Sequence, residues 1–420
     1  MIALLLPLAC VGTRGIALGD GEPSLSHPED VGGFPSDTDE DTGEDTDEDP
    51  DPDEEDALFE AFYAFGSLHE VRLQLSEEAI DAMNRDVREA STGRDLVMEW
   101  QHGDVEIDGV AFSDVAVRVK GSSTLQSFDG KPSLKIKLNE YVPGQKYAGL
   151  ERITLNNDVE DASQAKQVLV YHVNALAGRQ ASRASHAQVW VNDELYGLYT
   201  NLETFDDHWL ERRYEDATGD LWEANDYADF TRAGLSEWEL KSGVGDADAL
   251  VAVSDALADG GDGFYQRLDA LVDMDDFVKF WAWRVMVGDF DGYPMTANDL
   301  YLYGDPSDGG RITFIPWGVD EAWYAYGPEY WYYATCELAL KCQADVFCAA
   351  VFVQALEDVV DEYETLGVLE DADAMFDATA DALEADPRRP YGASEAVQAR
   401  ATLRDDMEQF PARIRAAAGF

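Results

Sequence analysis

Acidic and amide side chains recur in one segment of the last third of the sequence, GDFDGYPMTANDLYLYGDPSDGGRITFIPWGVDEAW. They are Asp289, Asp291, Asn298, Asp299 and Asp320. The first four precede a short β-prone run at residues 301–303, and Asp320 follows a second such run at residues 312–315. If the two runs pair as a hairpin, Asp320 returns beside the loop at residues 291–299, and several carboxylates converge.

Such a convergence has a definite chemical use. One carboxylate can orient an attacking hydroxyl group and accept its proton, while other carboxylates and an amide oxygen hold Mg²⁺ against phosphate oxygens. The same residue types also form ordinary turns, because Asp-Gly and Asn-Asp pairs favour turn conformations. The spacing differs from that of classical protein kinases, whose catalytic Asp and metal-binding Asn are closer together than Asp291 and Asn298. Phosphate chemistry and a plain turn are therefore both open at this point.

The sequence before residue 165 predicts mainly β-strands. Apolar residues alternate at Val71, Leu73 and Leu75, and Ser76 with two following glutamates then predicts the start of a helix. Three more alternating sets follow along the chain. They are Val115, Val117 and Val119; Leu134, Ile136 and Leu138; and Ile153 with Leu155. These runs predict an early β-rich region.

Helical spacing of apolar residues begins at Ala165 and ends near Gly178, which predicts a helix there. A hairpin is expected from residues 187–191 and 195–200, and an aromatic helix from residues 275–287. From Phe347 onward the pattern is helical. The order favours an α+β fold with a β-rich first lobe, a helical second lobe and a cleft between them.

The composition limits the partners that this protein can have. The 420 residues are 45% hydrophobic, enough for a large core, and the formal charge is -56. Such a negative field repels nucleic acid and attracts cations and basic proteins. We therefore expect no nucleic-acid partner.

The N-terminal residues 1–10, MIALLLPLAC, predict an export signal that is too short to span a bilayer. Leu6, Leu8 and Ala9 before Cys10 resemble a bacterial lipoprotein signal, with Cys10 as the lipidation site; ordinary signal cleavage is the alternative. Residues 11–60 are expected to form an acidic disordered linker, because residues 37–56 hold fourteen Asp or Glu and no basic residue. Contact with a membrane is expected only through the lipid.

Three cysteines lie within thirteen residues near the end of the predicted hairpin region. They are Cys336, Cys342 and Cys348. An exported protein reaches an oxidising compartment, so one disulfide among them is expected, and a metal site is less favoured because no histidine lies nearby. The pairing stays open at this point.

Four segments, in order, resemble the CotH kinase family, the spore coat protein H-like kinases. They are VRVKGSSTLQSFDGKPSLKIKL, LNNDVEDASQAKQVLVYHVNALAG, VWVNDELYGLYTNLETFDDHWL, and DGYPMTANDLYLY followed by FIPWGVDEAW. The resemblance covers about residues 68–418. It implies an atypical protein-kinase-like fold over residues 61–420, with an N-lobe at about 61–205 and a C-lobe at about 206–420.

The resemblance also implies an activity, which is transfer of phosphate from ATP to protein side chains with Mg²⁺ or Mn²⁺. Asp291 would be the catalytic Asp, and Asn298, Asp299 and Asp320 would bind the metal. Trp317 would border the nucleotide. A basic or Ser/Thr-rich protein would be the substrate, and the cell envelope or the extracellular space the location.

In the first lobe, the resemblance assigns the turn at Gly121, Ser122 and Ser123 to the phosphates, although a plain hairpin turn is the alternative. Lys135 or Lys137 would meet the α and β phosphates. Both lysines face the same side of their strand, so the pattern does not choose between them. Glu203 matches a family position and would serve nucleotide binding, or it is a surface glutamate at a strand end.

Two departures from the family pattern leave three functions open. The family usually has Trp-Asp-x-Asp where Gly318 stands two residues before Asp320, and Lys166 with Gln167 replaces a common Arg-Glu pair. The protein is then an active exported kinase, a catalytically impaired pseudokinase that serves as a surface binding or assembly protein, or another metal-dependent phosphate enzyme. Asp299 carries a carboxylate where the family has asparagine, and this charge would replace the missing one.

Overall fold

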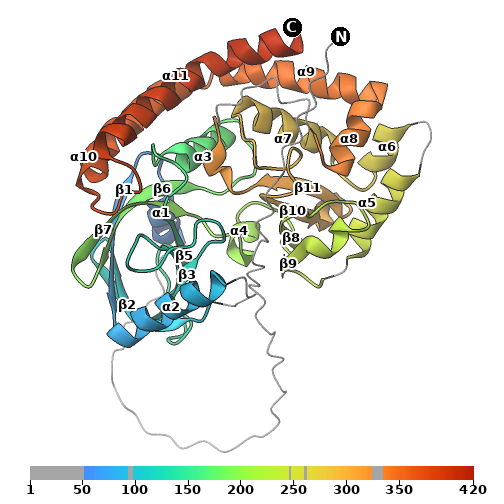
Figure 1. The fold of residues 1–420 in the computed structure, drawn as a ribbon. Coiled ribbons are helices and arrows are strands. Elements are labelled where there is room, and N and C mark those ends of the chain that lie inside the picture. Colours follow the sequence, from blue (N-terminus) through green and yellow to red (C-terminus); the bar gives the residue numbers. More distant parts are fainter. Residues whose placement is uncertain (1–51, 93–97, 246, 260–262, 324–333) are drawn as a thin grey trace, which may run out of the picture.

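A computed structural model of the chain describes residues 52–92, 98–245, 247–259, 263–323 and 334–420. The fold is a mixture of α-helices and β-strands, as the sequence predicted (Figure 1). The predicted export signal, Cys10 and the acidic segment up to residue 51 lie outside the described residues.

The first half of the described chain forms a closed barrel. Its strands, in the order in which they pair, are β1 (Leu68–Leu75), β2 (Gln101–Ile107), β3 (Val110–Lys120), β4 (Ser133–Lys137), β5 (Arg152–Asn156), β7 (Glu194–Leu202) and β6 (Ala184–Val191). A parallel pairing of β1 with β6 closes the barrel, and the other pairings are antiparallel. Alternating residues such as Leu134 and Ile136 are fully buried in its core, and closure leaves these strands without exposed edges.

Helix α1 (Pro52–Phe62) corrects the predicted linker, because it begins inside the 11–60 segment. Phe59 and Phe62 join the hydrophobic core of the barrel. Glu54 and Glu55 lie in the first turn, where negative charge is favourable to the helix dipole. The carboxylate-rich composition therefore concealed a helix start, and the folded part begins before residue 61.

Two further helices lie beside the barrel. Helix α2 (Glu77–Ala90) starts at the predicted cap, since the Ser76 side chain accepts a hydrogen bond from the Ala79 backbone N–H at 3.1 Å. Helix α3 (Lys166–Leu176) follows a loop that Asp161 organises. The Asp161 carboxylate accepts hydrogen bonds from the backbone N–H groups of Ala165 and Lys166, which satisfies the helix start.

The second half is helical around a small sheet that was not fully predicted. The sheet pairs β11 (Arg311–Pro316), β10 (Leu300–Asp305), β8 (Leu221–Ala224) and β9 (Trp238–Ser242) in that order. Helices α4 (Asp207–Glu211), α5 (Asp248–Ala258), α6 (Phe264–Asp269), α7 (Met274–Met286), α8 (Glu337–Ala344) and α9 (Val346–Tyr363) belong to this half. Its main hydrophobic core is separate from that of the barrel. A division into two kinase lobes with a cleft stays a prediction.

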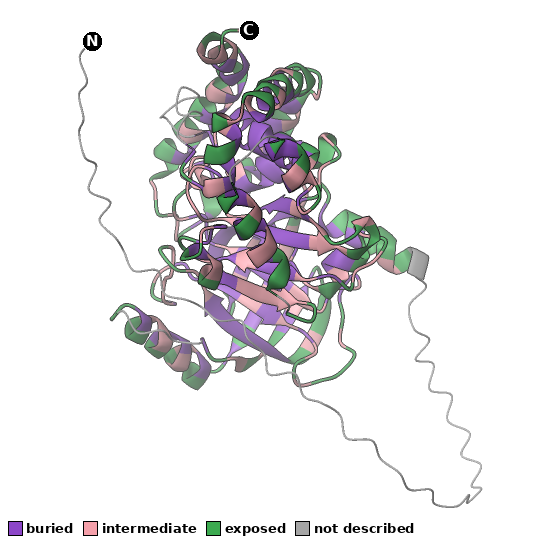
Figure 2. Ribbon diagram, turned by 90° about the vertical axis from the view of Figure 1, so that its right-hand side faces the viewer, coloured by how far each residue is buried: buried purple, intermediate pink, exposed green. Residues whose placement is uncertain are grey.

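Helices α10 (Val368–Ala385) and α11 (Ala393–Ala418) connect the two halves. Helix α10 contacts β7 of the barrel, and α11 contacts α7 and α9 of the helical half. Figure 1 shows them arching along one side of the molecule. Their inward faces are buried and their outward faces exposed, as is typical of amphipathic surface helices (Figure 2).

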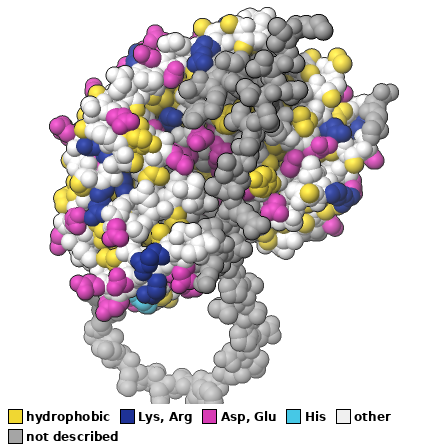
Figure 3. Space-filling model, viewed as in Figure 1, with side chains coloured by type: hydrophobic (Ala, Val, Ile, Leu, Met, Phe, Trp, Pro, Cys, Tyr) yellow, Lys and Arg dark blue, Asp and Glu magenta, His cyan; other side chains and the backbone are white. Residues whose placement is uncertain are grey.

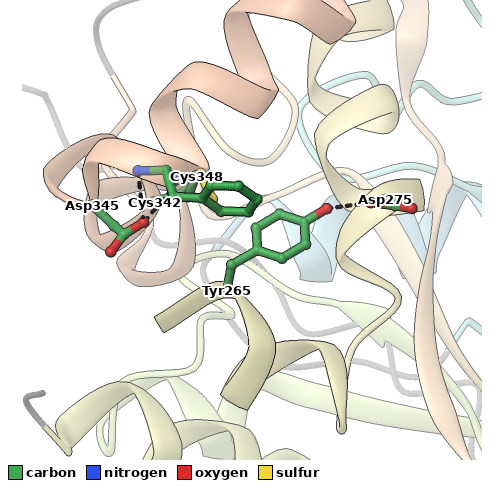
Figure 4. Close-up of a disulfide and its surroundings, with 6 residues drawn as sticks. Tyr265, Asp275, Cys342, Asp345 and Cys348 are labelled. Atoms are coloured by element: carbon green, nitrogen blue, oxygen red, sulfur yellow. Dashed lines mark hydrogen bonds between the residues drawn. A yellow bond between two sulfur atoms is a disulfide. The ribbon is translucent and has the colours of Figure 1, made fainter. Parts of the chain in front are cut away.

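The expected disulfide joins Cys342 of α8 to Cys348 of α9, while Cys336 is a buried thiol (Figure 4). Phe347 beside it packs edge-on against Tyr265 of α6 at 5.3 Å between ring centroids. The Tyr265 hydroxyl donates a hydrogen bond to Asp275 of α7. The disulfide thus lies at a corner where four helices, α6, α7, α8 and α9, meet.

Across the described ranges, no single helix has both the length and the apolar composition to cross a membrane; the sharply bent pair α8 and α9 meets those criteria only when taken together. Acidic side chains occur across the face drawn in Figure 3, between smaller groups of basic side chains.

Candidate active site

The predicted hairpin is present and brings two distant segments together. Strands β10 and β11 are antiparallel, with Leu300 opposite Pro316. Asp299 just before β10 therefore lies beside Gly318 just after β11. Asp320 follows in a short 3₁₀ turn, η3 (Val319–Glu321). The hairpin register is what gathers the carboxylates.

Asp291 lies in the loop between α7 and β10 and is partly buried. The Thr296 hydroxyl donates mainly to the Asp291 backbone oxygen and lies 3.4 Å from the carboxylate, to which Asn298 Nδ2 donates at 3.5 Å. Burial raises the pKa of Asp291, and the nearby Asp320 carboxylate adds to this, while Arg284 and the two hydrogen bonds oppose it. Asp291 is thus oriented from two sides and is a more basic carboxylate than usual.

Asp299 and Gly318 occupy the same small space. Both have left-handed backbones, with φ of 52° and 56°. A Cβ atom on residue 318 would lie 2.3 Å from Cγ of Asp299, so no side chain fits there while the Asp299 carboxylate stays in place. Burial and the carboxylates of Asp291 and Asp320 raise the pKa of Asp299 well above its usual value.

Arg284 of α7 holds the loop in place, and the sequence analysis missed it. Its guanidinium pairs with Asp289 at 2.6 Å and donates to the backbone oxygens of Trp317 at 3.3 Å and Asp299 at 3.2 Å. A Cβ on Gly292 would overlap this guanidinium, at 1.0 Å from Nη2, so glycine is required there. In the sequence, the sign of this role was an arginine among the aromatic residues of the helix predicted at 275–287. Asp289 is therefore a structural partner of Arg284, and burial raises its pKa to about 6.

Lys120 at the end of β3 is the second residue that was missed. Its Nζ donates to Asn156 Oδ1 at 2.5 Å, and Asn156 donates to Gln167 Oε1 at 2.9 Å. Gln167 in turn donates to Asp320. Lys120 Nζ also lies 5.8 Å from the ring centroid of Trp317. A polar chain thus runs from the barrel wall through α3 to the carboxylates.

The electrostatics of Asp320 agree with this arrangement. Burial raises the pKa of Asp320, while the hydrogen bond from Gln167 and the positive charge of Lys120 lower it. Gln167 stands where the family has an acidic residue. The amide therefore links the lysine side of the barrel to Asp320 without adding a further negative charge.

Lys135 and Lys137 on β4 lie on the outer side of the barrel, because their neighbours Leu134 and Ile136 are inside it. Lys137 pairs with Glu140 at 2.7 Å. Lys120 is paired with Ser133 at the start of β4, and Lys137 follows Ser133 by four residues, which is roughly 13 Å along a strand. Lys135 lies between them, opposite Arg118 and Thr154. Whether either lysine meets a phosphate stays a prediction.

The turn at Gly121, Ser122 and Ser123 follows Lys120 directly. Gly121 has φ of 117°, which requires glycine. Ser122 and Ser123 are exposed, and the Ser123 side chain hydrogen-bonds Glu160. Burial raises the pKa of Glu160, as do the nearby carboxylates of Asp320 and Asp291. The turn therefore lies next to the carboxylate cluster.

Glu203 and Trp317 are the remaining residues that the sequence predicted for nucleotide binding. Glu203 is 1% exposed, and its carboxylate accepts hydrogen bonds from both terminal nitrogens of the Arg213 guanidinium. The alternative of a surface glutamate is therefore wrong. A nucleotide role for this engaged carboxylate stays a prediction. The Trp317 ring meets Phe205 at 5.4 Å and Tyr301 at 5.8 Å, both edge-on, which fixes its orientation beside Lys120.

The donor set suits a divalent cation that binds together with phosphate. Burial raises the pKa values of Asp291, Asp299 and Asp320, and a nearby carboxylate adds to each: Asp320 for Asp291, Asp291 and Asp320 for Asp299, and Asp161 for Asp320. A positive charge among them would relieve the repulsion. Within residues 52–420, apart from the undescribed gaps, no three acidic, histidine or cysteine side chains form a ready metal cage.

The chain is similar to a family model, to a curated protein and to a solved structure. The family model described as CotH kinase protein matches residues 117–346. The inner spore coat protein H of Bacillus subtilis (strain 168) is 24% identical over 228 residues, which are 50% of this chain and 59% of that protein. A crystal structure of the Helicobacter pylori proinflammatory kinase CtkA aligns with 70% of this chain and 93% of its own, at 7% identity and a TM-score of 0.30.

The family match includes the turn after Lys120, helix α3 and the whole hairpin with Asp291 and Asp320. The stretch matched to the Bacillus protein spans less than two thirds of that relative. Because the family model covers more than half of the chain, the protein belongs to the CotH kinase family.

Proposed function

We propose that this protein is an exported, metal-dependent kinase that transfers the γ-phosphate of ATP to serine or threonine hydroxyls of proteins. Family membership supports kinase-like chemistry in general. The observation that carries the proposal is the convergence of Asp291, Asn298, Asp299 and Asp320 from two chain segments, with Lys120 approaching from the barrel.

Asp291 is the proposed base. Its hydrogen bonds from Thr296 and Asn298 fix the direction of the carboxylate, and its raised pKa makes it a better acceptor for the proton of a hydroxyl group. The hydroxyl oxygen bonds to the γ-phosphorus as the bond to ADP breaks, and the proton passes to Asp291. Asn298, Asp299 and Asp320 would hold the divalent cation, which supplies positive charge beside the phosphates.

Lys120 and the turn at Gly121–Ser123 would bind the phosphates. Lysine supplies a point charge, and exposed backbone N–H groups in a tight turn are suited to anions. Trp317, held by two aromatic rings, would border the base or ribose. Lys120 therefore replaces Lys135 and Lys137 as our first choice for the phosphate-binding lysine.

The charge that Gly318 lacks is supplied at position 299 in this proposal. The Asp299 carboxylate fills the space that a side chain on residue 318 would need. An aspartate at 299 and a glycine at 318 are thus mutually compatible, whereas two carboxylates would collide. This geometry weakens the argument that Gly318 makes for the binding-module alternative, and so it favours an active enzyme.

Substrate and location follow from charge and from the N-terminal sequence. With a formal charge of -56, the protein would attract basic substrates, and serine or threonine residues in them would supply the acceptor hydroxyls. The similar Bacillus protein is named as a spore coat protein, which supports an extracytoplasmic place for this chain as well. A lipid on Cys10 would hold it at the cell envelope.

Incubation of the full chain with γ-labelled ATP, Mg²⁺ or Mn²⁺ and a basic protein tests the proposal. We expect label on the protein and at least a 100-fold lower rate in Asp291→Asn, since a general base contributes about that much. Asp361→Asn, on the exposed face of α9, is the matched control and should leave the rate unchanged. Absence of both nucleotide binding and labelling in the parent would refute the kinase function and favour the binding-module alternative.

A further inference from the structure

The chain beyond the family match makes buried contacts with the loops beside the proposed site. The match ends at residue 346, whereas Asp386 follows α10 forty residues later. Asp386 is 2% exposed, and its carboxylate accepts from Lys131 Nζ at 2.8 Å and from the Leu198 backbone N–H at 3.1 Å. A Cβ on Gly197 would collide with it at 2.2 Å. The barrel wall is shaped to receive this one carboxylate.

Arg388, two residues on, holds the same loop from outside. Its Nη1 donates to the backbone oxygens of Phe128 at 3.1 Å and of Gly130 at 2.8 Å, and its Nη2 binds Glu194 at 2.7 Å. The guanidinium also lies 3.8 Å from the ring centroid of Tyr196. Together with Asp386, it fixes the second half of the loop that begins with the Gly121–Ser123 turn.

A second loop is held by the same C-terminal part of the chain. The Tyr391 hydroxyl donates to the Val159 backbone oxygen at 2.9 Å, and Arg400 Nε donates to that of Ser163 at 3.0 Å. These residues belong to the loop before α3, which carries Glu160. Sequence separations above 200 residues make such contacts invisible to local patterns.

The two loops are joined to each other beside the carboxylate cluster. Asn157 Nδ2 donates to the backbone oxygens of Thr124 at 3.1 Å and Lys131 at 2.8 Å. Ser123 bonds Glu160. The position of the turn thus depends on contacts made by residues 386–400.

We propose that residues 386–400 position the Gly121–Ser123 turn for nucleotide binding, with Asp386 and Arg388 as positioning residues. The nucleotide part rests on the proposed function, whereas the positioning of the loop does not. Loss of Arg388 releases the backbone oxygens of Phe128, Asp129 and Gly130 at once, so the turn samples other conformations and the affinity for ATP falls.

Hydrogen exchange in the full chain tests the positioning without any nucleotide. In Arg388→Ala, amides of residues 121–131 are expected to exchange at least tenfold faster. Arg389→Ala is the matched control, because the neighbouring guanidinium binds the backbone oxygens of Leu383 and Glu384 at the end of its own helix α10. Equal exchange in the two variants would overturn the proposal.

ATP affinity and steady-state kinetics provide the second reading. We expect the KM for ATP to rise about tenfold in Arg388→Ala, with kcat and the KM for the protein acceptor nearly unchanged, and Arg388→Lys to recover part of the loss. Faster amide exchange in Arg388→Ala together with an unchanged affinity for ATP would overturn the role in nucleotide binding. If the parent binds no ATP and amide exchange in Arg388→Ala is still faster than in the parent, the proposed kinase function is refuted and the positioning role stands.

Discussion

The protein buries carboxylates in two places and treats them in opposite ways. At the C-terminal contact with the barrel, Asp386 receives a lysine ammonium, two backbone N–H groups and an amide from Gln164. In the carboxylate cluster, Asp291, Asp299 and Asp320 share few cations and repel one another. The negative charge of Asp386 is compensated by its partners, whereas the negative charges of the cluster are not.

This difference separates a structural site from a functional one. A buried charge is tolerated when partners compensate for it, and an uncompensated group lowers stability. Carboxylates that repel one another in the folded state need a ligand to balance them, and shifted pKa values of this kind gather at functional sites. We therefore expect changes at Asp386 to cost stability, and neutralisation within the cluster to increase it.

The largest effect is expected when the compensated pair is broken. Lys131→Met leaves the Asp386 carboxylate buried without its cation and should lower the free energy of unfolding by about 3 to 5 kcal/mol. Lys341→Met, which removes an exposed lysine paired with Glu337, should cost at most about 1 kcal/mol. Urea unfolding of both variants measures the difference. Similar losses in the two would contradict the comparison.

A buried histidine of the barrel gives the next largest effect. Burial lowers the pKa of His186 to about 4. Between pH 6.5 and pH 4 this histidine is therefore protonated in the unfolded chain and neutral in the folded chain. The stability held above pH 6.5 is therefore lost as the pH falls toward 4. Relative to His186→Gln, the parent should lose about 3 kcal/mol over this range. Urea unfolding of the parent and the variant across this pH range measures the difference, and equal losses in the two proteins would contradict it.

The smallest effect should have the opposite sign. The pKa of Asp299 is raised on folding, so its ionisation opposes folding more strongly as the pH rises above the unfolded value near 4. Asp299→Asn should stabilise the metal-free protein by about 1 to 2 kcal/mol at pH 8 and by almost nothing at pH 4. Thermal unfolding at the two pH values measures it. Destabilisation at pH 8 would show that the carboxylate is structural.

Local patterns predicted much of the fold and the hairpin of the site. Alternation located β1, β3, β4 and β5, and a serine cap located α2, because those signals act within a few residues. Strands β2, β8 and β9 were missed. Strands β8 and β9 are short and lack clear alternation, and β2 offers only Val105 and Ile107 as alternating apolar residues. The acidic start of α1 was assigned to the linker, because composition outweighed the aromatic residues Phe59 and Phe62.

Site residues that act through long-range contacts were beyond the sequence. Lys120 stands at the last position of β3, and only the barrel geometry brings it to Asn156 and the cluster. Arg284 looked like one charge in an aromatic helix until its three partners were in view. Residues matched by motif were placed together, whereas residues that position them came from distant parts of the chain.

The most direct test of the central claim is the affinity of the full chain for ATP with and without Mg²⁺, measured by calorimetry in the parent and in Asp320→Asn. If the cluster binds metal and phosphate together, Mg²⁺ should tighten ATP binding at least tenfold in the parent and have little effect in the variant. ATP binding that is absent, or that responds to Mg²⁺ equally in both proteins, would contradict the assignment of this cluster as a kinase centre.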